Sequence, residues 1–578
     1  MDSTGSAKGN QKRSPLDLII NQLRRKASFT ERKKPAVGRL FRPSESNGKR
    51  NGEIPELKES EGSEEKENSE PKKEVNNLDD EIGSVVGWDR VKQFIEKLGK
   101  TPQSQNLNLS HCDLTATDVV ELATLLPFLP QLDVMDLSWN DLVGGSLKAL
   151  TAHLQHLERL RVLKLCSCRL TAQDLTALGE SLDCIPLMEV IDLSWNVGIG
   201  AGNLGDFTSR LRADNTLKEL RLVDCQLSET DITALSVALP MLSSLEDLDL
   251  SNNKLLVKGM KNFTSSLGST PRLKSLKLSM CGLNKDSFNI LGQALRFITG
   301  LEHLDLSCNK KASGGLTSMA TNLTHLKHLK SLDLHLCCLT KEDMLALVQV
   351  ASSLQELREL DLSSNKSVGD TLQDLLHTLP LHQISKLPLN NCALSTSACH
   401  ALAANMVNFK QLESLNLSWN KCVGENLKEF LEPLKAADSK LQELRLSSCN
   451  LTTEDVLHIE SACQRGVLSR LKQLDLSYNG SVGDGGWTSL FGKAGCLKNL
   501  EELDVSLRPA TCLSASPWLP ALLEALPQLP CLTRLSMQHW AVSSAEREKL
   551  EKILSKKNVI LECEATPTSK ATSYREVL

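Results

Sequence analysis

The chain has 578 residues, of which 24% are charged and only 3% aromatic, and its formal net charge is −5 at pH 7. This acidic balance gives no general electrostatic reason to bind nucleic acid. The sequence contains no run of about 18 apolar residues, which a membrane span would require. The first twenty residues also lack an apolar stretch typical of a secretory signal. We therefore expect a cytoplasmic protein with no transmembrane segment and no nucleic-acid partner.

The N-terminal part of the chain carries two blocks of opposite charge. Residues 1–52 hold thirteen Lys or Arg against four Asp or Glu, and residues 53–81 hold twelve acids against four bases. Neither block has enough apolar residues for a core, so residues 1–82 are predicted to be a disordered charged tail. A short apolar stretch within residues 14–26 fits either a docking or membrane-surface helix or a solvated tail. Residues 83–103 are predicted to form a helical cap, because Trp88, Val91 and Phe94 fall at helical spacing.

A nine-residue motif, Leu-x-x-Leu-x-Leu-x-x-Asn or Cys, recurs about every 28 residues from Leu107 to Met537. Its clearest copy runs from Leu132 to Asn140. Fourteen copies alternate Cys and Asn at the ninth position: Cys112, Asn140, Cys168, Asn196, Cys225, Asn253, Cys281, Asn309, Cys337, Asn365, Cys392, Asn420, Cys449 and Asn479. Two weaker copies end at Arg508 and Trp540, which indicates the far end of the array.

Each motif copy is expected to form a short strand followed by a turn. Positions four and six point into the core, whereas positions three, five and seven point to the opposite face. The chain then turns, and inward-facing backbone groups need hydrogen-bond partners. Asn and Cys at position nine are predicted to supply them as a structural ladder.

This alternation resembles the ribonuclease-inhibitor-like class of leucine-rich repeats over roughly residues 104–540. The resemblance implies an α/β leucine-rich-repeat solenoid of about 16 repeats: a curved horseshoe with a parallel β-sheet on its concave face and helices on its convex face. It also implies protein binding. We expect the repeats at 104–508, a degenerate repeat and C-terminal cap at 509–562, and a flexible tail at 563–578, whose terminal carboxylate could act as a weak PDZ-type ligand.

Helix starts between the motifs follow two patterns. Cys-type units contain capping boxes in which Asp replaces the usual Glu: Thr115-x-x-Asp118, Thr171-x-x-Asp174, Ser228-x-x-Asp231, Thr340-x-x-Asp343 and Thr452-x-x-Asp455. Asn-type units place a glycine four residues after Asn, at Gly144, Gly200, Gly369, Gly424 and Gly483, where we expect a turn with positive φ.

Eighteen cysteines are present, and seven occupy the ladder position. The others, among them Cys166, Cys184, Cys308, Cys338 and Cys422, show no CxxC spacing. The pattern predicts free thiols in a reducing compartment, with no metal site and no cofactor.

Position five of the motif forms a column on the exposed sheet face. Its charges alternate in sign as far as Lys277, which predicts neutralising lateral pairs. Asp305, Asp333 and Asp361 then adjoin, with His303 and His335 on the same face. Either an external cation or basic partner binds there, or solvent screens the acids and the histidines offset them.

Position eight carries Trp139, Trp195, Trp419 and Tyr478 at the edge where the chain leaves the sheet. Exposed Trp and Tyr are common anchors in protein interfaces. The alternative is that each ring packs on the preceding turn as part of the fold.

No set of residues converges on catalysis. We therefore expect a non-enzymatic scaffold or adaptor that binds proteins on the concave face and the strand-exit edge. The alternative is an enzyme regulator, either a GTPase activator or a ribonuclease-inhibitor-like inhibitor. The inhibitor is disfavoured because the concave charges are expected to cancel largely, whereas secreted ribonucleases are basic. Pro388 is predicted to be a weak joint, because proline cannot donate the N–H that a central strand requires.

Overall fold

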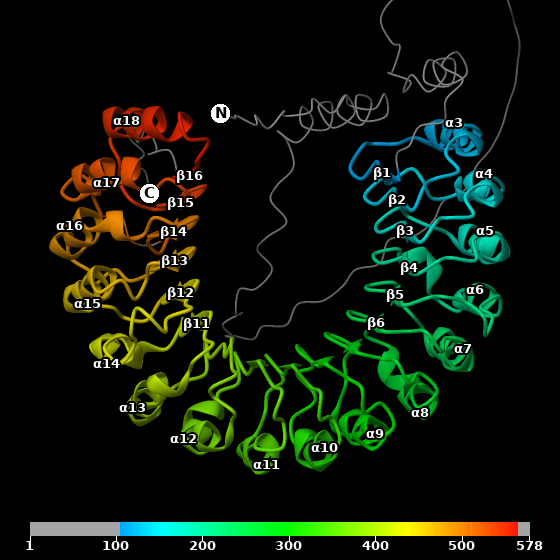
Figure 1. The fold of residues 1–578 in the computed structure, drawn as a ribbon, viewed down its shortest axis with the longest axis horizontal. Helices are drawn as coiled ribbons and strands as arrows, with labels where there is room; N and C mark the ends of the chain where they lie inside the picture. The colour runs from blue at the N-terminus through cyan, green and yellow to red at the C-terminus, as the bar shows by residue number, and fades with distance from the viewer. Residues whose placement is uncertain (1–104, 510, 512, 564–578) are drawn as a thin grey trace, which may run out of the picture.

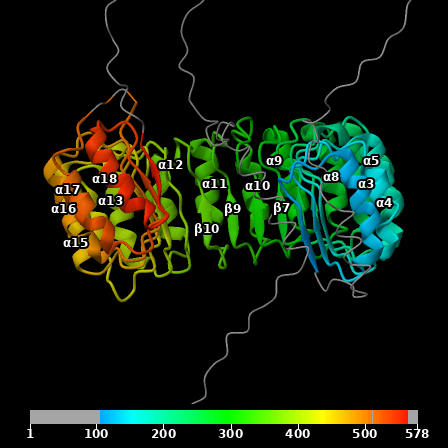
Figure 2. The same cartoon turned by 90° about the horizontal axis from the view of Figure 1, so that it is seen from above.

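The computed structural model describes residues 105–509, 511 and 513–563, and these form one curved solenoid (Figure 1). Short strands line the inside of the curve and helices cover the outside, as Figure 2 also shows from above. The predicted leucine-rich-repeat horseshoe is thus confirmed. The predicted tails and the N-terminal cap at 83–103 lie outside the described residues, apart from Cys563. None of the helices in the described ranges is long and apolar enough to cross a membrane.

The strands pair in parallel with their neighbours in sequence, except that β10 and β11 do not pair with each other. They are β1 Asn106–Asn108, β2 Val134–Asp136, β3 Val162–Lys164, β4 Val190–Asp192, β5 Glu219–Arg221, β6 Asp247–Asp249, β7 Ser275–Lys277, β8 His303–Asp305, β9 Ser331–Asp333, β10 Glu359–Asp361, β11 Ser414–Asn416, β12 Glu443–Arg445, β13 Gln473–Asp475, β14 Glu502–Asp504, β15 Arg534–Ser536 and β16 Ile560–Glu562.

The α-helices alternate with the strands, except that α12 and α13 both lie between β10 and β11. They are α3 Ala116–Leu125, α4 Leu147–Thr151, α5 Ala172–Ser181, α6 Leu204–Thr208, α7 Glu229–Ala238, α8 Leu256–Leu267, α9 Lys285–Leu295, α10 Leu316–Leu323, α11 Lys341–Ala351, α12 Val368–Thr378, α13 Thr396–Asn405, α14 Leu427–Leu431, α15 Thr453–Gln464, α16 Asp484–Gly492, α17 Leu519–Ala525 and α18 Ser544–Ser555.

The sheet divides at Pro388 into a ten-stranded part, β1–β10, and a six-stranded part, β11–β16. Between them Lys386 forms only single bridges, to Glu359 and to Ser414. Hydrogen bonds continue on both sides of the proline, since Leu360 N donates to Lys386 O at 3.1 Å and Leu389 N donates to Asn416 O at 3.0 Å. The missing N–H therefore interrupts the regular strand without separating the repeats.

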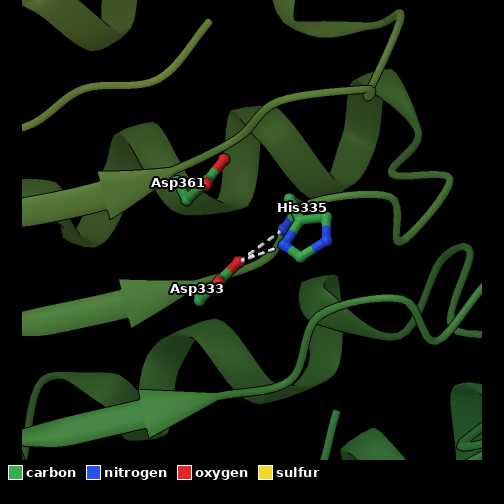
Figure 3. Close-up of side chains that lie close together, drawn as sticks. All are labelled: Asp333, His335 and Asp361. Carbon is green, nitrogen blue, oxygen red and sulfur yellow. Dashed lines mark hydrogen bonds and ion pairs between the residues drawn. The ribbon is translucent and has the colours of Figure 1, made fainter. Parts of the chain in front are cut away.

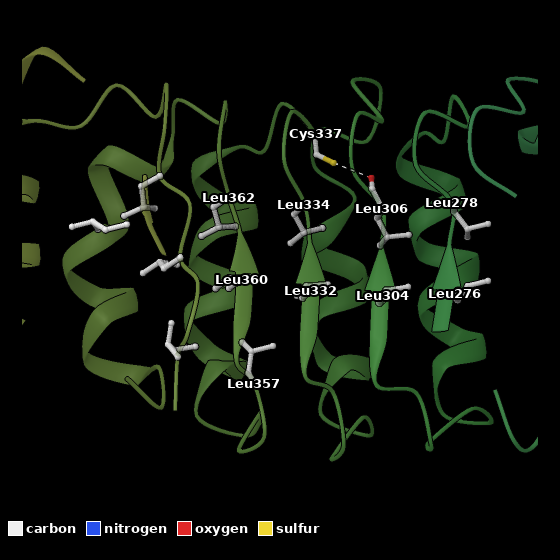
Figure 4. Close-up of a cluster of buried hydrophobic side chains, with 14 of the residues drawn as sticks. Leu276, Leu278, Leu304, Leu306, Leu332, Leu334, Cys337, Leu357, Leu360 and Leu362 are labelled. Carbon is white, nitrogen blue, oxygen red and sulfur yellow. Dashed lines mark hydrogen bonds between the residues drawn. The ribbon is translucent and has the colours of Figure 1, made fainter. Parts of the chain in front are cut away.

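The ninth motif position connects each repeat to the one before it. Asn140 Oδ1 accepts from the backbone N–H of Cys112 and of Leu114, and its Nδ2 donates to Leu109 O at 2.9 Å. Cysteine at this position makes the equivalent bond with a shorter side chain: the Cys337 thiol donates to Leu306 O, 3.1 Å away (Figure 4). Its leucine neighbours in Figure 4 are stacked from strand to strand in the buried core.

The ladder thiols donate because they stay protonated. Burial raises the pKa of the Cys168 thiol to about 12, and its Sγ lies 3.2 Å from Leu137 O. A buried thiol with such a pKa is a poor nucleophile at neutral pH.

The five predicted capping boxes are all present. Four of their aspartates, all except Asp118, also reach the preceding repeat. Asp174 accepts from Thr171 N at 2.8 Å, and it accepts from Gly145 N at 2.7 Å and Leu147 N at 3.1 Å at the start of α4. One carboxylate therefore caps two helix starts, which explains why the shorter Asp stands where Glu is usual.

The prediction of positive φ at Gly144, Gly200, Gly369, Gly424 and Gly483 is wrong, because the positive-φ glycines are elsewhere, at Gly145 and Gly202 among others. Four of these glycines instead lie against the next repeat, whereas Gly483 lies against Thr453 of the preceding one. A Cβ on Gly144 would sit 1.9 Å from Arg169 O, and one on Gly424 would sit 2.2 Å from Asn450 O. Close backbone approach between repeats is what requires glycine at four of them; at Gly483 the nearest atom is Thr453 Oγ1, at 3.1 Å.

The expectation that the cysteines are free thiols fails at one place, where Cys399 and Cys422 form a disulfide. Cys399 lies in α13, and Cys422 lies in the 3-10 turn Lys421–Val423 of the next repeat. Sequence spacing could not reveal the pair, because its members come together only when consecutive repeats stack.

The C-terminal repeats contain a cluster of buried aromatic rings. Trp518 packs on Trp540 with ring centroids 4.8 Å apart, and Phe491 and Trp487 also contact Trp518. Trp540 stands at motif position nine, where the array was expected to decay. Its Nε1 donates to Val505 O at 2.7 Å, so the indole makes the inter-repeat bond that Asn makes elsewhere.

Candidate protein-binding surface

The concave surface is built by motif positions three and five, which we call the strand face: the first and last residues of each strand, together with Lys386 and Pro388. Both positions point away from the leucine core because side chains alternate along a strand. The strand face carries fourteen acids against six bases, a formal balance of −8 with histidines neutral. The acids are Asp136, Asp192, Glu219, Asp247, Asp249, Asp305, Asp333, Glu359, Asp361, Glu443, Asp475, Glu502, Asp504 and Glu562.

The position-five charges are not neutralised by lateral pairs as predicted. Lys277 does reach Asp249, at 3.7 Å, but it also reaches Asp247 at 3.5 Å. Arg221 pairs with Glu219 on its own strand, 2.8 Å away. Reading position five alone omitted the acids at position three, so the expectation that concave charges largely cancel is corrected here.

Several strand-face acids form no ion pair in the part of the chain that the structure describes. Within the described residues, no ion pair reaches seven of the fourteen: Asp136, Asp192, Asp305, Asp361, Asp475, Glu502 and Asp504. By contrast, five of the six bases already pair with strand-face acids. The excess negative charge therefore remains available to an outside group.

Asp305, Asp333 and Asp361 lie in register at the ends of β8, β9 and β10. Asp333 Oδ1 accepts from the backbone N–H of His335 and lies 2.9 Å from its Nδ1 (Figure 3). The other ring nitrogen, Nε2, lies 3.0 Å from Cys308 Sγ. His335 thus offsets the middle acid of the three, whereas the predicted partner His303 is exposed at the start of β8.

The pKa values of this group shift in consistent directions. The carboxylate of Asp333 and then the Cys308 thiol raise the pKa of His335 to about 11, although burial opposes the shift. Burial raises the pKa of Asp305 and of Asp361, and the charge of Asp333 adds to both. His335 lowers the pKa of both flanking acids only slightly, because it forms its hydrogen bond with Asp333.

Asp333, His335 and Asp361 are also the side chains best placed to hold a metal. Their ligand atoms lie within 4.8 Å of one another, and Figure 3 shows Asp361 on the strand next to that of Asp333. The Asp333 carboxylate and the His335 imidazole already satisfy each other by hydrogen bonding.

Position eight adopts the left-handed backbone conformation in fifteen of the sixteen copies, all except Leu507. Trp139, Trp195, Trp419 and Tyr478 have φ of 62°, 63°, 65° and 61°. Their backbone N–H groups donate to the next repeat; Trp195 N, for example, donates to Val223 O at 2.6 Å. The turn therefore fixes the backbone and directs the side chain outward.

The three tryptophans at position eight are 46%, 48% and 54% exposed, in the order Trp139, Trp195 and Trp419. Trp139 stacks on His111 of the preceding repeat with centroids 5.4 Å apart, and Trp419 meets the edge of Tyr478 at 6.4 Å. Half of each indole is thus left for contact with another molecule. Packing on the preceding turn occurs at Trp139, whereas Trp419 contacts Tyr478 two repeats further along the array, so the two interpretations of this column are not exclusive.

Sequence reasoning missed several members of this surface. The position-three acids, such as Glu219 and Glu502, were identifiable because positions three and five share a face. Arg508, at position nine of a weak copy, reaches back two repeats to Ser448 Oγ, and no local pattern predicts that contact.

The chain is similar to several known leucine-rich-repeat proteins. The family model described as "Leucine Rich repeat" matches residues 325–348, 354–371 and 469–491. Ribonuclease inhibitor of Mus musculus is 26% identical over 404 residues, which cover 68% of this chain and 87% of that protein. Ribonuclease inhibitor of Sus scrofa is 27% identical over 425 residues, covering 71% and 91%. NACHT, LRR and PYD domains-containing protein 14 of Homo sapiens is 30% identical, covering 56% of this chain and 30% of its own length.

Among solved structures, a chain from the crystal structure of the Rad7 and Elc1 complex in yeast has a TM-score of 0.40 and 16% identity, with 73% of this chain and 88% of that chain covered. The repeat geometry makes the chain a leucine-rich-repeat solenoid. Within this class, it is similar to the two ribonuclease inhibitors over most of their length.

Proposed function

We propose that this protein is a non-enzymatic scaffold or adaptor that binds a partner protein on its strand face and along its position-eight edge. The observation that carries the proposal is the combination of an acidic strand face, formally −8, with three half-exposed tryptophans beside it. Aromatic anchors next to charged residues are typical of protein interfaces. The partner that fits this surface is a basic protein with apolar contacts at one edge.

The proposal places the protein in the cytoplasm. Ladder thiols such as Cys168 and Cys337 must stay reduced to donate their hydrogen bonds, and a reducing compartment keeps them so. Residues 576–578, which could form a weak PDZ-type ligand, lie outside the described residues.

A second candidate is an inhibitor of a basic ribonuclease. Two relatives, from Mus musculus and Sus scrofa, carry the name ribonuclease inhibitor, and most of their length is covered. The argument against this function from cancelling charges no longer applies, because the strand face is acidic. A competition assay with a basic ribonuclease separates this candidate from a scaffold that binds a different protein.

A GTPase activator is the remaining alternative. It predicts that the purified protein raises the turnover of a GTPase, whereas a scaffold binds its partner stably with no effect on turnover. Measuring GTP hydrolysis with and without the protein distinguishes the two.

The direct test is partner capture by Trp139→Ala combined with Trp195→Ala. Both side chains project from turns whose backbone hydrogen bonds remain, so we expect an unchanged circular dichroism spectrum and melting temperature. Binding should fall by about 2 kcal/mol or more per anchor, the range of interface hot spots.

A matched control is Val237→Ala, which removes a 73% exposed apolar side chain from α7 on the convex face. This variant should bind as the wild type does. Equal binding by the tryptophan variant and the control would show that the partner does not use the position-eight edge.

A further inference from the structure

The strand face and the N-terminal segment of the same chain have opposite charge. Residues 8–50 contain all thirteen Lys and Arg of the basic block, with three Asp or Glu among them. The strand face presents the −8 balance described above, and most of its own bases are already paired. Each of these two regions therefore lacks a counter-charge that the other could supply.

The negative charge of the strand face is concentrated at acids that form no ion pair with another described residue. At the centre of the array, three basic side chains already form ion pairs. Lys386 pairs with Glu359 at 2.9 Å, Lys330 pairs with Glu302, and His335 pairs with Asp333. Asp305 and Asp361 remain on either side of Asp333, in no ion pair within the described ranges. Further along, Asp475 and Asp504 adjoin in register on β13 and β14.

By contrast, the incoming edge of the sheet at motif position two is balanced. Its bases alternate with acids and pair with them, as in Lys274 with Glu246 and Lys218 with Glu189. A basic segment would therefore be drawn to the strand face and not to this neighbouring edge. The surface that attracts it is the same surface to which the proposed function assigns the partner.

The length of the connecting chain permits the contact. Fifty-five residues, 51–105, separate Arg50 from the start of β1. A chain of that length spans at most about 200 Å. Seven strand steps of about 4.8 Å put β8 roughly 34 Å from β1 along the sheet. Tethering also raises the effective concentration of the segment at the strand face, so that weak individual ion pairs add up to binding.

We propose that the basic segment, residues 8–50, binds the strand face of its own solenoid, around Asp305 and Asp361, and occupies the surface that a partner protein uses. The docking itself depends only on the charges described here. Its regulatory consequence, that a partner must displace the segment, rests on the proposed function. Salt weakens such a contact because exposed charges are screened beyond a Debye length of about 10 Å at 0.1 M.

The test is zero-length cross-linking of the full chain with a carbodiimide, which joins a lysine amine to a carboxylate in contact with it. The segment contains six lysines: Lys8, Lys12, Lys26, Lys33, Lys34 and Lys49. We expect cross-links from these lysines to Asp305, Asp361, Asp475 or Asp504 at 50 mM salt, and their loss at 500 mM. Mixing ¹⁴N- and ¹⁵N-labelled chains should show that they form within one molecule.

Three results would overturn the docking. They are cross-links only to the acids of residues 53–81, cross-links only between molecules, or cross-links equally frequent to convex-face acids such as Glu229 and Glu454. Each of these leaves the proposed partner binding untouched, because none of them measures a partner.

A second measurement uses a labelled peptide of residues 8–50 added to the full chain. In a variant whose thirteen basic residues at 8–50 are replaced by Gln, the strand face is free, and the peptide should bind at least tenfold more tightly than it binds the wild type. A variant with the six lysines changed to Arg keeps the charge and should bind the peptide as weakly as the wild type. Equal affinity for all three chains contradicts the proposal.

Discussion

The indole N–H of Trp540 donates to the carbonyl oxygen of Val505 at 2.7 Å, and both groups are buried. The same bond joins each earlier Asn of the ladder to position six of the preceding repeat; Asn479 and Leu446 are one such pair, at 2.8 Å. The tryptophan thus extends the inter-repeat ladder beyond the last Asn, while its ring fills the end of the core.

Trp540→Phe should therefore be destabilising. The substitution leaves Val505 O buried without a donor, which costs about 1–3 kcal/mol. Trp518→Phe is the matched control, because the indole N–H of Trp518 is buried and has no hydrogen-bond partner in the described part of the chain. Thermal melting of both variants checks the prediction, and an equal loss in the two would argue against a ladder role for Trp540.

Asp174→Ala should cost more than Asp118→Ala, although both residues stand at the same place in a capping box. Asp174 caps its own helix and the start of α4, whereas the hydrogen bonds of Asp118 lie within its own box, to Thr115. At about 1 kcal/mol per cap, we expect losses of roughly 2 and 1 kcal/mol. Hydrogen exchange at the amides of Gly145 and Leu147 should accelerate only in the Asp174 variant.

Amides near Pro388 should exchange faster than those of a regular repeat. The sheet is interrupted there, and a solenoid opens where neighbouring repeats couple weakly. Residues 276–281 provide a matched comparison, because the helix that follows them starts at Asn284-x-x-Ser287 and lacks the capping Asp, as does Ser395-x-x-Ala398. The two units share that departure, so the proline and the Cys399–Cys422 disulfide are what distinguish them.

We expect Pro388→Val to slow exchange at residues 387–392 to the rate at residues 276–281. Because the Cys399–Cys422 disulfide joins the repeats beside this joint, the experiment should be run with and without reductant. Protection at 387–392 equal to that at 276–281 in the reduced wild type would contradict the prediction.

His335 should stabilise the fold most at low pH. Its folded pKa is raised to about 11 by the Asp333 carboxylate, from an ordinary value near 6.5. The stabilisation is fully present below about 6.5 and is lost as pH rises toward the folded value. The melting temperature of His335→Gln should thus approach that of the wild type between pH 7 and pH 10. Asp333→Asn should lower the His335 pKa in an NMR titration, and an unchanged pKa would show that the pair does not form.

The repeat period could be predicted from the sequence because each repeat obeys local rules. Alternation of Asn140 and Cys168 types, leucine spacing and Thr-x-x-Asp starts all act within about thirty residues, so the solenoid and its capping boxes were predictable. Pro388 was identifiable for the same reason, since the missing N–H is a property of one residue.

Contacts between repeats could not be predicted in this way. The need for Gly144 comes from Arg169 O of the next repeat, and the disulfide from the stacking of α13 on the following turn. The half-exposed state of Trp195 depends on the left-handed turn, which no side chain of the motif encodes. The acidity of the strand face could have been predicted from the sequence, because the side chains at positions three and five point to the same face of the sheet.

The most direct test of partner binding on the concave side is site-specific photo-cross-linking in cells. A photoreactive phenylalanine analogue is placed at Trp419, which is 54% exposed at the position-eight edge, or at Val237, which is 73% exposed on convex helix α7. We predict a discrete protein adduct from position 419 and none from position 237. Adducts of equal yield at both positions, or an adduct only at 237, would contradict the assignment of binding to the concave side.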